Sequence, residues 1–329
     1  MDLTNLFNAY PGIHIVQAFF HSLIAAVVAD RAIIAWNIRS PMVRQKFHLI
    51  AVFGPVFSYP LYQWISPERG SIQFRLGALF DSNRWLSPEL WDVLPLGLLF
   101  IALLVATTAI FLIQELIPIL RHEPGEEDAS PEPFPAAEGS PAVTAAESLP
   151  GGAPDIFIVE DEDPFIHSVT SRSPGIYLTT GLIKILEPAE LRAAIAHEVA
   201  HIRRSRRPLL IVAYLTRVLL FFSPGTLVAF RRAADEEEKI CDDWAVKVTG
   251  RPDALAAVLE KLRHSAAYEI DEHEPGEALR AVERMSYDLM VRERIRRLTE
   301  GESTVVQTGD WLKFAVTVAS IAIVGYYIV

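Results

Sequence analysis

The chain has 329 residues, a formal net charge of −11 and one cysteine, and 51% of its residues are hydrophobic. A single cysteine excludes a disulfide framework and any multi-cysteine metal cluster, so a metal site would need His and carboxylate ligands. The acidic balance argues against nucleic acid as a partner. Because the apolar residues are concentrated in long uncharged runs, the composition indicates a membrane protein.

Four apolar segments are long enough to cross a bilayer. They lie at residues 13–29, 46–68, 93–114 and 311–329. The first could be a secretory signal, but Asp2 is the one charged residue before it, and a signal needs a basic segment there. In the last segment, Lys313 can extend its ammonium group to the interface. We therefore predict a three-span region over residues 1–121 and a C-terminal spanning helix over residues 309–329, about four spans in all.

Two histidines, His14 and His21, lie inside the first span. They could act as ligands or proton carriers, although hydrogen bonding to neighbouring membrane helices is the commoner explanation.

Basic residues favour one orientation of these spans. Arg31, Arg39, Arg44 and Lys46 fall in the short connection between the first two spans, whereas the longer second connection has three basic residues. Cytoplasmic loops carry an excess of Lys and Arg, so the first connection is predicted to be cytoplasmic. The chain is then a multi-pass protein of the inner membrane, with residues 121–310 in the cytoplasm.

The composition changes between residues 122 and 154, where Pro, Ala, Glu, Gly and Ser dominate and Lys and Arg are absent. This composition predicts a flexible acidic linker. A cytoplasmic domain is predicted to follow over residues 155–308. Its first part contains two short strand-like segments, at 155–159 and 175–181, before a helix that begins at Glu187-Pro188.

An apolar segment over residues 208–230 lies inside this domain. It is interrupted by Arg217 and Pro224 and has arginines at both ends, so it does not read as a simple crossing. We predict a re-entrant or interfacial helical hairpin associated with the membrane. An ordinary buried helix pair is the alternative.

The predicted helix before the hairpin carries the sequence His197-Glu198-Val199-Ala200-His201. Two histidines four residues apart project from one face of a helix, so both imidazoles can reach one tetrahedral cation. Glu198 is placed to contact a metal-bound water and to accept its proton as a general base. This HExxH pattern therefore predicts peptide hydrolysis at a zinc centre.

A second segment of helical character follows the hairpin. Glu238 could supply the third metal ligand and leave the fourth position open, although the acidic run that begins at Asp235 could be a solvated face. Asp242, one turn later, could orient a ligand histidine through its other ring nitrogen. Cys241 could be a fourth ligand or a redox-sensitive thiol, but a small packed residue is the simpler interpretation.

The sequence HEVAHIRRSRR, the apolar segment with its Ser-Pro break and the later E-x-x-C-D-D pattern carry a family resemblance. Together they resemble the integral-membrane metallopeptidases of the BlaR/MecR antirepressor type, which are close relatives of the HtpX and CAAX-prenyl endopeptidase group. The resemblance covers residues 155–298, and the amino-terminal spans match in number and placement. The antirepressor sensors carry an extracellular penicillin-binding domain after the last span, so direct β-lactam sensing is not expected of a chain that ends at Val329.

The resemblance implies a mainly α membrane protein with a helical zincin-like (gluzincin) catalytic domain and a small β-sheet. It implies one zinc ion per chain, and it assigns four roles: zinc ligands His197, His201 and Glu238, general base Glu198, and Asp242 as the carboxylate that orients a ligand.

Peptide hydrolysis also needs a place for the substrate and a donor for the oxyanion. We predict that substrate binds in extended form along an edge strand made of Ile176, Tyr177, Leu178, Thr179 and Thr180, whose unpaired backbone groups would accept any sequence. Candidate oxyanion donors are His264, Tyr268, Tyr287 and Arg294, and the sequence does not choose among them.

The sequence thus predicts a membrane-embedded zinc metalloendopeptidase that cleaves membrane-proximal protein or peptide substrates, itself included, in a regulatory or signalling pathway. One alternative is an HtpX-like quality-control protease for membrane proteins. Another is a non-catalytic scaffold or sensor with structural zinc. The intact Glu198 argues against this alternative, because a structural site has no need of that carboxylate. Assembly into a homo-oligomer stays open.

Overall fold

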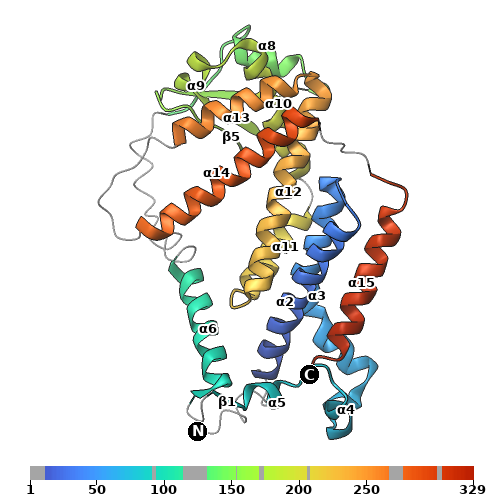
Figure 1. The fold of residues 1–329 in the computed structure, drawn as a ribbon. Helices are drawn as coiled ribbons and strands as arrows, with labels where there is room; N and C mark the ends of the chain where they lie inside the picture. Colours follow the sequence, from blue (N-terminus) through green and yellow to red (C-terminus); the bar gives the residue numbers. More distant parts are fainter. Residues whose placement is uncertain are drawn as a thin grey trace. The chain divides into compact units, whose positions relative to one another are not determined.

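The computed structural model describes residues 12–90, 94–113, 132–152, 154–169, 174–205, 208–266, 277–301 and 306–329. The chain is mainly helical and divides into two compact units, which are considered separately. The bundle unit comprises Met1–Pro124, Leu209–Glu236 and Val305–Val329, and the sheet unit comprises Gly125–Pro208 and Glu237–Thr304. Figure 1 shows the elements of both.

The bundle unit is built from helices and contains one two-stranded ribbon among the described residues. Its helices α2, α3 and α15 pack against one another. Its elements are α2 (Gly12–Ala35), α3 (Pro41–Ile65), η1 (Pro67–Gly70), α4 (Ile72–Leu76), α5 (Ser82–Leu86), β1 (Glu89–Leu90), β2 (Leu94–Pro95), α6 (Leu96–Phe111), α11 (Pro208–Leu219) from Leu209 onward, α12 (Pro224–Thr249) as far as Glu236, and α15 (Asp310–Tyr326).

All four predicted spans are helical, but four membrane crossings are not confirmed. In the described part of the chain, α2 is the one helix both long and apolar enough to cross a bilayer, while α6 and α11 are apolar but shorter. Helix α3 is as long as α2 but less apolar, because Pro55, Pro60 and several polar side chains interrupt its apolar run, and α15 has 17 residues and contains Lys313. Length and apolar content therefore separate α2 from the other three.

The apolar segment 208–230 does form two helices, joined by residues 220–223. The second of them, α12, continues without a break to Thr249, so it is both an arm of the hairpin and the helix of Glu238. Gly225, at the start of α12, packs closely against α2: a Cβ there would meet backbone atoms of Ser22 and Leu23 at 2.7 Å. Only glycine fits at that distance.

A buried arginine holds the carboxyl end of α15. Arg69 is 1% exposed, and its guanidinium donates to the backbone carbonyls of Tyr326 (2.9 Å), Gly325 (3.2 Å) and Ile328. It also lies over the ring of Tyr62, 4.8 Å from its centroid. The last carbonyls of a helix have no partner within the helix, so Arg69 supplies the donors that they lack.

The sheet unit contains a four-stranded mixed sheet in the order β3-β4-β6-β5. Its strands are β3 (Phe134–Pro135), β4 (Asp155–Val159), β5 (Ile166–Val169) and β6 (Gly175–Thr179). Strands β4 and β6 are parallel, and the other pairs are antiparallel. Alternate residues such as Ile176 and Leu178 are fully buried, whereas Tyr177 between them is partly exposed and stacks on Phe157.

Helices make up most of the rest of this unit. They are α8 (Pro141–Glu147), α9 (Thr180–Ile185), α10 (Pro188–Ser205), α12 from Glu237 onward, α13 (Pro252–Ala266) and α14 (Glu277–Glu300). Of these, α9 and α10 contact the strands of the sheet directly. Helix α10 contacts α8, α13, β5 and β6, so it runs through the centre of the unit. Its residues Ile195 and Ala196 are completely buried in the core cluster.

The prediction of a flexible linker over residues 122–154 is wrong for its second half. Strand β3 pairs with β4, and Ala142, Ala145, Ala146 and Leu149 of the α8 region lie in the hydrophobic core. These four apolar residues recur at helical spacing, a pattern that the Pro- and Glu-rich average composition concealed. Residues 122–131 lie outside the described part of the chain.

The prediction that Ile176–Thr180 forms an edge strand is also wrong. Strand β6 lies between β4 and β5, with Ile176 aligned with Ile156 on one side and Ser168 on the other. Thr180 belongs to α9. The short, partly polar strand β5 was not recognised in the sequence, and it occupies the edge that β6 would otherwise have.

Candidate metal centre

The HExxH sequence lies in the second half of α10, as predicted. Pro188 opens this helix, and the carboxylate of Glu190 accepts a hydrogen bond from the backbone N–H of Glu187 at 2.8 Å. Proline fits the first turn, and an acidic side chain there satisfies a free donor and the helix dipole. With Ile195 and Val199 buried in the core, the helix is fixed in rotation. Its histidines therefore have a fixed direction.

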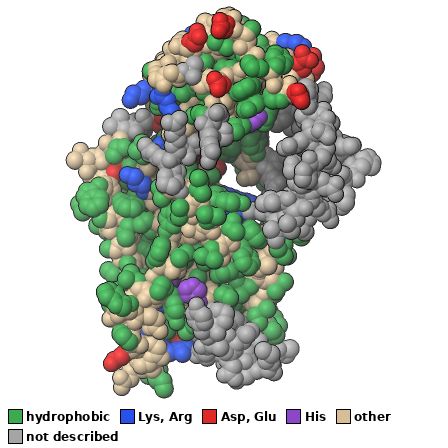
Figure 2. Space-filling model, turned by 180° about the vertical axis from the view of Figure 1, so that it is seen from behind, with side chains coloured by type: hydrophobic (Ala, Val, Ile, Leu, Met, Phe, Trp, Pro, Cys, Tyr) green, Lys and Arg blue, Asp and Glu red, His purple; other side chains and the backbone are tan. Residues whose placement is uncertain are grey.

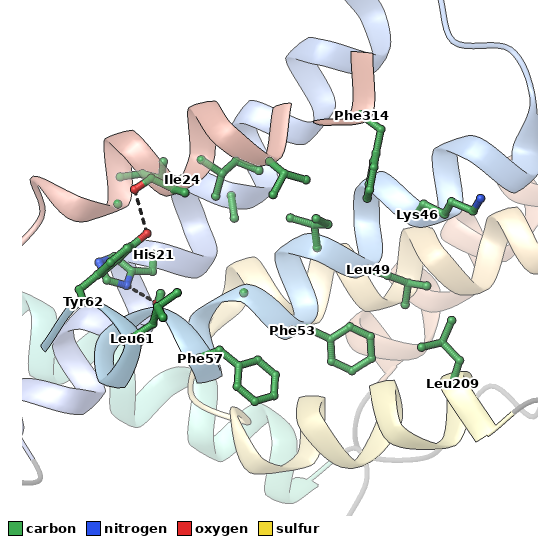
Figure 3. A pocket seen from close by; sticks show the side chains of 18 residues that line it. His21, Ile24, Lys46, Leu49, Phe53, Phe57, Leu61, Tyr62, Leu209 and Phe314 are labelled. Carbon is green, nitrogen blue, oxygen red and sulfur yellow. Dashed lines mark hydrogen bonds between the residues drawn. The ribbon is translucent and has the colours of Figure 1, made fainter. Parts of the chain in front are cut away.

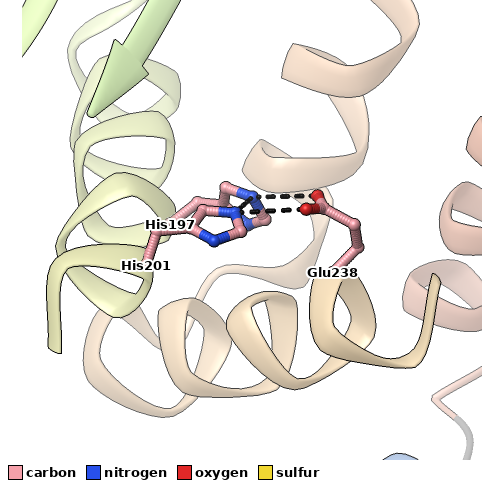
Figure 4. A group of neighbouring side chains, drawn as sticks. All are labelled: His197, His201 and Glu238. Atoms are coloured by element: carbon pink, nitrogen blue, oxygen red, sulfur yellow. Dashed lines mark hydrogen bonds and ion pairs between the residues drawn. The ribbon is translucent and has the colours of Figure 1, made fainter. Parts of the chain in front are cut away.

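Three of the predicted ligands converge. His197 Nε2 and His201 Nε2 lie 3.0 Å apart, and the two oxygens of Glu238 lie 3.5 Å from His197 Nε2 and 3.3 Å from His201 Nε2 (Figure 4). Ligands held about 2.0–2.1 Å from a tetrahedral zinc lie roughly 3.3–3.4 Å from one another. The three donors, two imidazoles and one carboxylate, thus fit zinc in both chemistry and spacing.

Asp242 is fully buried behind these ligands. Its Oδ1 lies 3.0 Å from Nδ1 of His197, the ring nitrogen that does not face Glu238. Arg294 of α14 donates to both oxygens of Asp242, from Nε at 2.8 Å and from Nη2 at 2.7 Å. A carboxylate in this position fixes the orientation of a ligand histidine, which is the role predicted for Asp242.

Arg294 also reaches the third ligand. Its Nη1 lies 3.0 Å from Oε2 of Glu238, and its side chain is 6% exposed. The sequence offered Arg294 as an oxyanion donor, but its guanidinium is engaged by Asp242 and Glu238. Arg294 therefore holds the two carboxylates of the candidate metal centre in position. Nothing in the sequence marks which arginine of α14 turns inward.

The charges of the centre stabilise one another. Burial alone would lower the pKa of His197, but hydrogen bonds to Asp242 and Glu238 raise it to about 9. Burial would raise the pKa of Asp242, but the Arg294 guanidinium holds it well below its usual range. The pKa of Glu238 is also lowered: against the opposing effect of burial, it is hydrogen-bonded to both histidines and lies beside Arg294. Both carboxylates are thus ionised at neutral pH.

Glu198 occupies a different position from the ligands. It follows His197 on α10, is 9% exposed, and makes no hydrogen bond or ion pair with any residue that the structure describes. Its carboxylate is therefore able to accept a proton from another partner.

Cys241 does not join the group of ligand atoms among the described residues. Its Sγ lies 3.5 Å from Nδ1 of His201, on the side of the ring away from Glu238, and the side chain is completely buried. Burial raises the pKa of its thiol, and the charges of Glu237 and Glu238 raise it further. A neutral thiol is a weak metal ligand, so a packed residue is the better interpretation.

The structure describes two of the three remaining oxyanion candidates. His264 is exposed on α13, with Nδ1 2.8 Å from the carbonyl of Glu260. Tyr287 is 45% exposed on α14, two turns before Arg294. Tyr268 lies outside the described residues.

A HExxH helix, a facing glutamate and a buried carboxylate that orients the first histidine define the sheet unit as a metallopeptidase domain. Comparison with known proteins agrees: residues 156–274 match the profile of Peptidase family M48. The matches support the HtpX-like metallopeptidase group, and they do not specifically support the antirepressor type.

Several curated proteins are similar over this region. The chain is 29% identical over 130 residues to the plastoglobule-localized metallopeptidase 48 of Arabidopsis thaliana, covering 36% of this chain and 38% of that protein. It is 35% identical over 77 residues to a protease HtpX homolog of Thermoplasma acidophilum, covering 23% and 24%. It is 31% identical over 154 residues to the protease HtpX homolog of Streptococcus gordonii, covering 44% and 50%. The alignments with these three span half or less of each relative's length, and no solved structure matches significantly.

Proposed function

We propose that this protein is a zinc-dependent endopeptidase anchored in a membrane, which cleaves protein substrates near the membrane surface. The observation that carries the proposal is the convergence of His197, His201 and Glu238 at tetrahedral spacing, with the uncommitted Glu198 on the same helix. When bound, zinc supplies the Lewis acid that activates water and polarises a peptide carbonyl.

The protein's own residues then have distinct tasks. Glu198 accepts the proton of the attacking water and passes it to the departing amine, as a general base and then a general acid. Asp242 holds the His197 ring so that Nε2 faces the metal, and Arg294 keeps Asp242 and Glu238 ionised and in place. Tyr287 is our preferred candidate for oxyanion stabilisation, since it lies on the same face of α14 as Arg294.

We place the substrate along β5 rather than along β6. Strand β5 ends the sheet order, and it contacts α10, the helix of the metal ligands. An extended peptide can add to such an edge through main-chain hydrogen bonds, which suits cleavage of varied sequences.

Exposed apolar residues of the bundle unit support membrane insertion. Large hydrophobic side chains cover much of the surface of this unit in the space-filling view (Figure 2). Phe57, Leu61 and Trp64 on α3 are among the exposed ones of the unit. Contiguous apolar surface of this kind marks a membrane or a partner. With α2 as the clearest span, we propose multi-pass insertion with the connection around Arg39 in the cytoplasm.

Two biological roles fit this chemistry. Matches to proteins named as HtpX homologues favour a broad protease for membrane proteins, whereas regulated cleavage in a signalling pathway was the first expectation from the sequence. A ladder of peptides from a membrane substrate would support the broad role, and one defined product would support the regulatory role.

The decisive experiment compares the wild type with Glu198→Gln. Both proteins, purified in detergent, are analysed for metal content and then incubated with membrane extract while new protein termini are mapped by mass spectrometry. We expect about one zinc in each, and new termini with the wild type alone. Zinc in both proteins without new termini would favour the non-catalytic scaffold, and absence of metal from both would refute the site.

A further inference from the structure

A cavity of about 450 Å³ lies in the bundle unit between α2, α3, α15 and Leu209 of α11 (Figure 3). Aliphatic and aromatic side chains form its walls, with Leu49, Phe53 and Phe57 on the α3 side and Ile321 on the α15 side. It shares no residue with the metal centre. It therefore needs an explanation of its own.

The sequence of α3 explains why the space exists. Gly54 lines the cavity, and a Cβ built there would meet no atom within 4 Å. Pro55 follows at once and Pro60 lies five residues later, so two intrahelical hydrogen bonds are missing and the helix cannot close regularly. A missing side chain beside two helix-breaking residues leaves a hollow in the wall.

Three polar side chains at one end of the cavity are engaged within the protein. Nδ1 of His21 lies 2.6 Å from the hydroxyl of Ser58, and the hydroxyl of Tyr62 donates to the carbonyl of Ala322 at 2.9 Å (Figure 3). Nε2 of His21 has no hydrogen-bond partner among the described residues, but this end carries no charged side chain in its lining. Because both hydroxyls already have partners, this end suits the apolar terminus of a ligand better than its charged group.

The other end carries a charge. Lys46 lines the cavity, is exposed, and forms no ion pair with any residue that the structure describes. Its neighbour Arg44, by contrast, is paired with Glu236 at 3.1 Å, and Arg232 is paired with Asp30. The ammonium group of Lys46 is therefore available to an anionic ligand.

Length and volume limit the kind of ligand. Lys46 and Tyr62 are sixteen residues apart on α3, which corresponds to about 24 Å along the helix. An α-helix of that length and about 10 Å across would occupy roughly 1,900 Å³. All the empty space at the cavity, its open side included, is about 1180 Å³, so a transmembrane helix of a substrate is too large. A single flexible hydrocarbon chain with an anionic group at one end fits the long, narrow, apolar space.

We propose that this cavity binds one acyl chain of an anionic glycerophospholipid, with the phosphate at Lys46 and the chain end near His21 and Tyr62. The lipid would complete the packing of α2, α3 and α15. This inference does not depend on peptidase activity, and its test uses bound lipid as the readout.

The test uses the full-length protein reconstituted in nanodiscs that contain phosphatidylglycerol and phosphatidylcholine in equal amounts. After extraction into mild detergent, the bound lipids are counted by native mass spectrometry. We expect about one retained phosphatidylglycerol per chain in the wild type, as for a basic site between membrane helices.

Two variants and two matched controls decide the matter. Gly54→Phe, which fills the cavity, should abolish retention, whereas Gly70→Phe, at a glycine that also has open space but does not line the cavity, should keep it. Lys46→Glu should reduce the preference for phosphatidylglycerol by about fivefold or more, while Arg39→Glu, in the same connection but outside the lining, should not. Metal content and thermal unfolding of each variant establish that it is folded.

Retention of lipid by a folded Gly54→Phe protein would overturn the site. Equal retention of phosphatidylcholine by the wild type would overturn the anionic head group. A lipid-modified peptide found in place of phospholipid would refute the proposed occupant.

Discussion

Arg294 binds both oxygens of Asp242, at 2.8 and 2.7 Å, so that one buried ion pair stands directly behind His197, a candidate metal ligand. The same guanidinium contacts Glu238 at 3.0 Å. One cation thereby sets the position of two carboxylates, Glu238, which is a candidate ligand, and Asp242, which is placed to orient a candidate ligand. The geometry of the metal group depends on a helix, α14, that contributes none of the three candidate ligands.

Replacement of Arg294 by methionine should loosen this arrangement. We expect zinc affinity to fall by about 10–100-fold, since groups that orient metal ligands contribute on that scale. Asp242 would lose its arginine partner and keep only His197, and removal of one partner from a buried ion pair costs up to roughly 3–5 kcal/mol of stability. Chelator competition measures the affinity, and thermal unfolding measures the stability.

Arg296→Met provides the control, because Arg296 is on the same helix but is half exposed and paired with Glu293. The double variant Arg294→Met, Asp242→Leu should recover stability without recovering zinc affinity. Normal zinc affinity in Arg294→Met would show that the ligands need no such support.

The raised pKa of His197 predicts how zinc binding depends on pH. In the metal-free protein, Asp242 and Glu238 hold this pKa at about 9 against the opposing effect of burial, so the ring is protonated at pH 7. Zinc has to displace the proton from Nε2. We therefore expect affinity to increase by about tenfold per pH unit from pH 7 to pH 9 and then to level off. Calorimetry in buffers of different ionisation enthalpy should show one proton released, and an affinity independent of pH in this range would contradict the prediction.

Cys241→Ala should leave the metal in place. Its thiol faces Nδ1 of His201, on the side of the ring away from Glu238, and its raised pKa keeps it neutral. We expect metal content within error of the wild type, whereas Glu238→Ala should lose most of its zinc. If Cys241→Ala loses zinc instead, the thiol is a fourth ligand and the non-catalytic scaffold becomes the better account.

The packing of α8 predicts an effect that a flexible linker would not give. Ala146 is completely buried, so Ala146→Leu should overpack the core and destabilise the sheet unit by about 1–3 kcal/mol. Ala137, which is exposed just before α8, should tolerate the same change. Thermal or denaturant unfolding of both variants provides the measurement, and equal stability of the two would restore the linker interpretation.

The sequence was sufficient to predict which residues form the candidate metal group, because their positions follow from local rules. A spacing of four residues within one helix places His197 and His201 together, and the later acidic helix offers few carboxylates. The three predicted ligands and Asp242 do come together in the structure.

Features that depend on contacts distant in sequence could not be predicted in this way. Strand β5 is four residues long and partly polar, and only its pairing with β6 makes it an edge. Likewise, four arginines lie close together on α14, and only the tertiary packing selects Arg294 as the one that meets Asp242. The composition of the segment before β4 predicted a flexible linker, because prolines and glutamates are frequent there. A few alanines at helical spacing nevertheless form a helix that packs in the core.

Arg69 recognises the end of α15 mainly through the carbonyls of Gly325, Tyr326 and Ile328, and its guanidinium also lies 5.9 Å from the ring centroid of Tyr326. Recognition of main-chain atoms depends on the path of the backbone and is indifferent to the identity of the residues along it. Substitutions of Ile328 that keep the turn should therefore be tolerated far better than any substitution of Arg69, so the stability of this helix end depends chiefly on one residue that is distant in sequence.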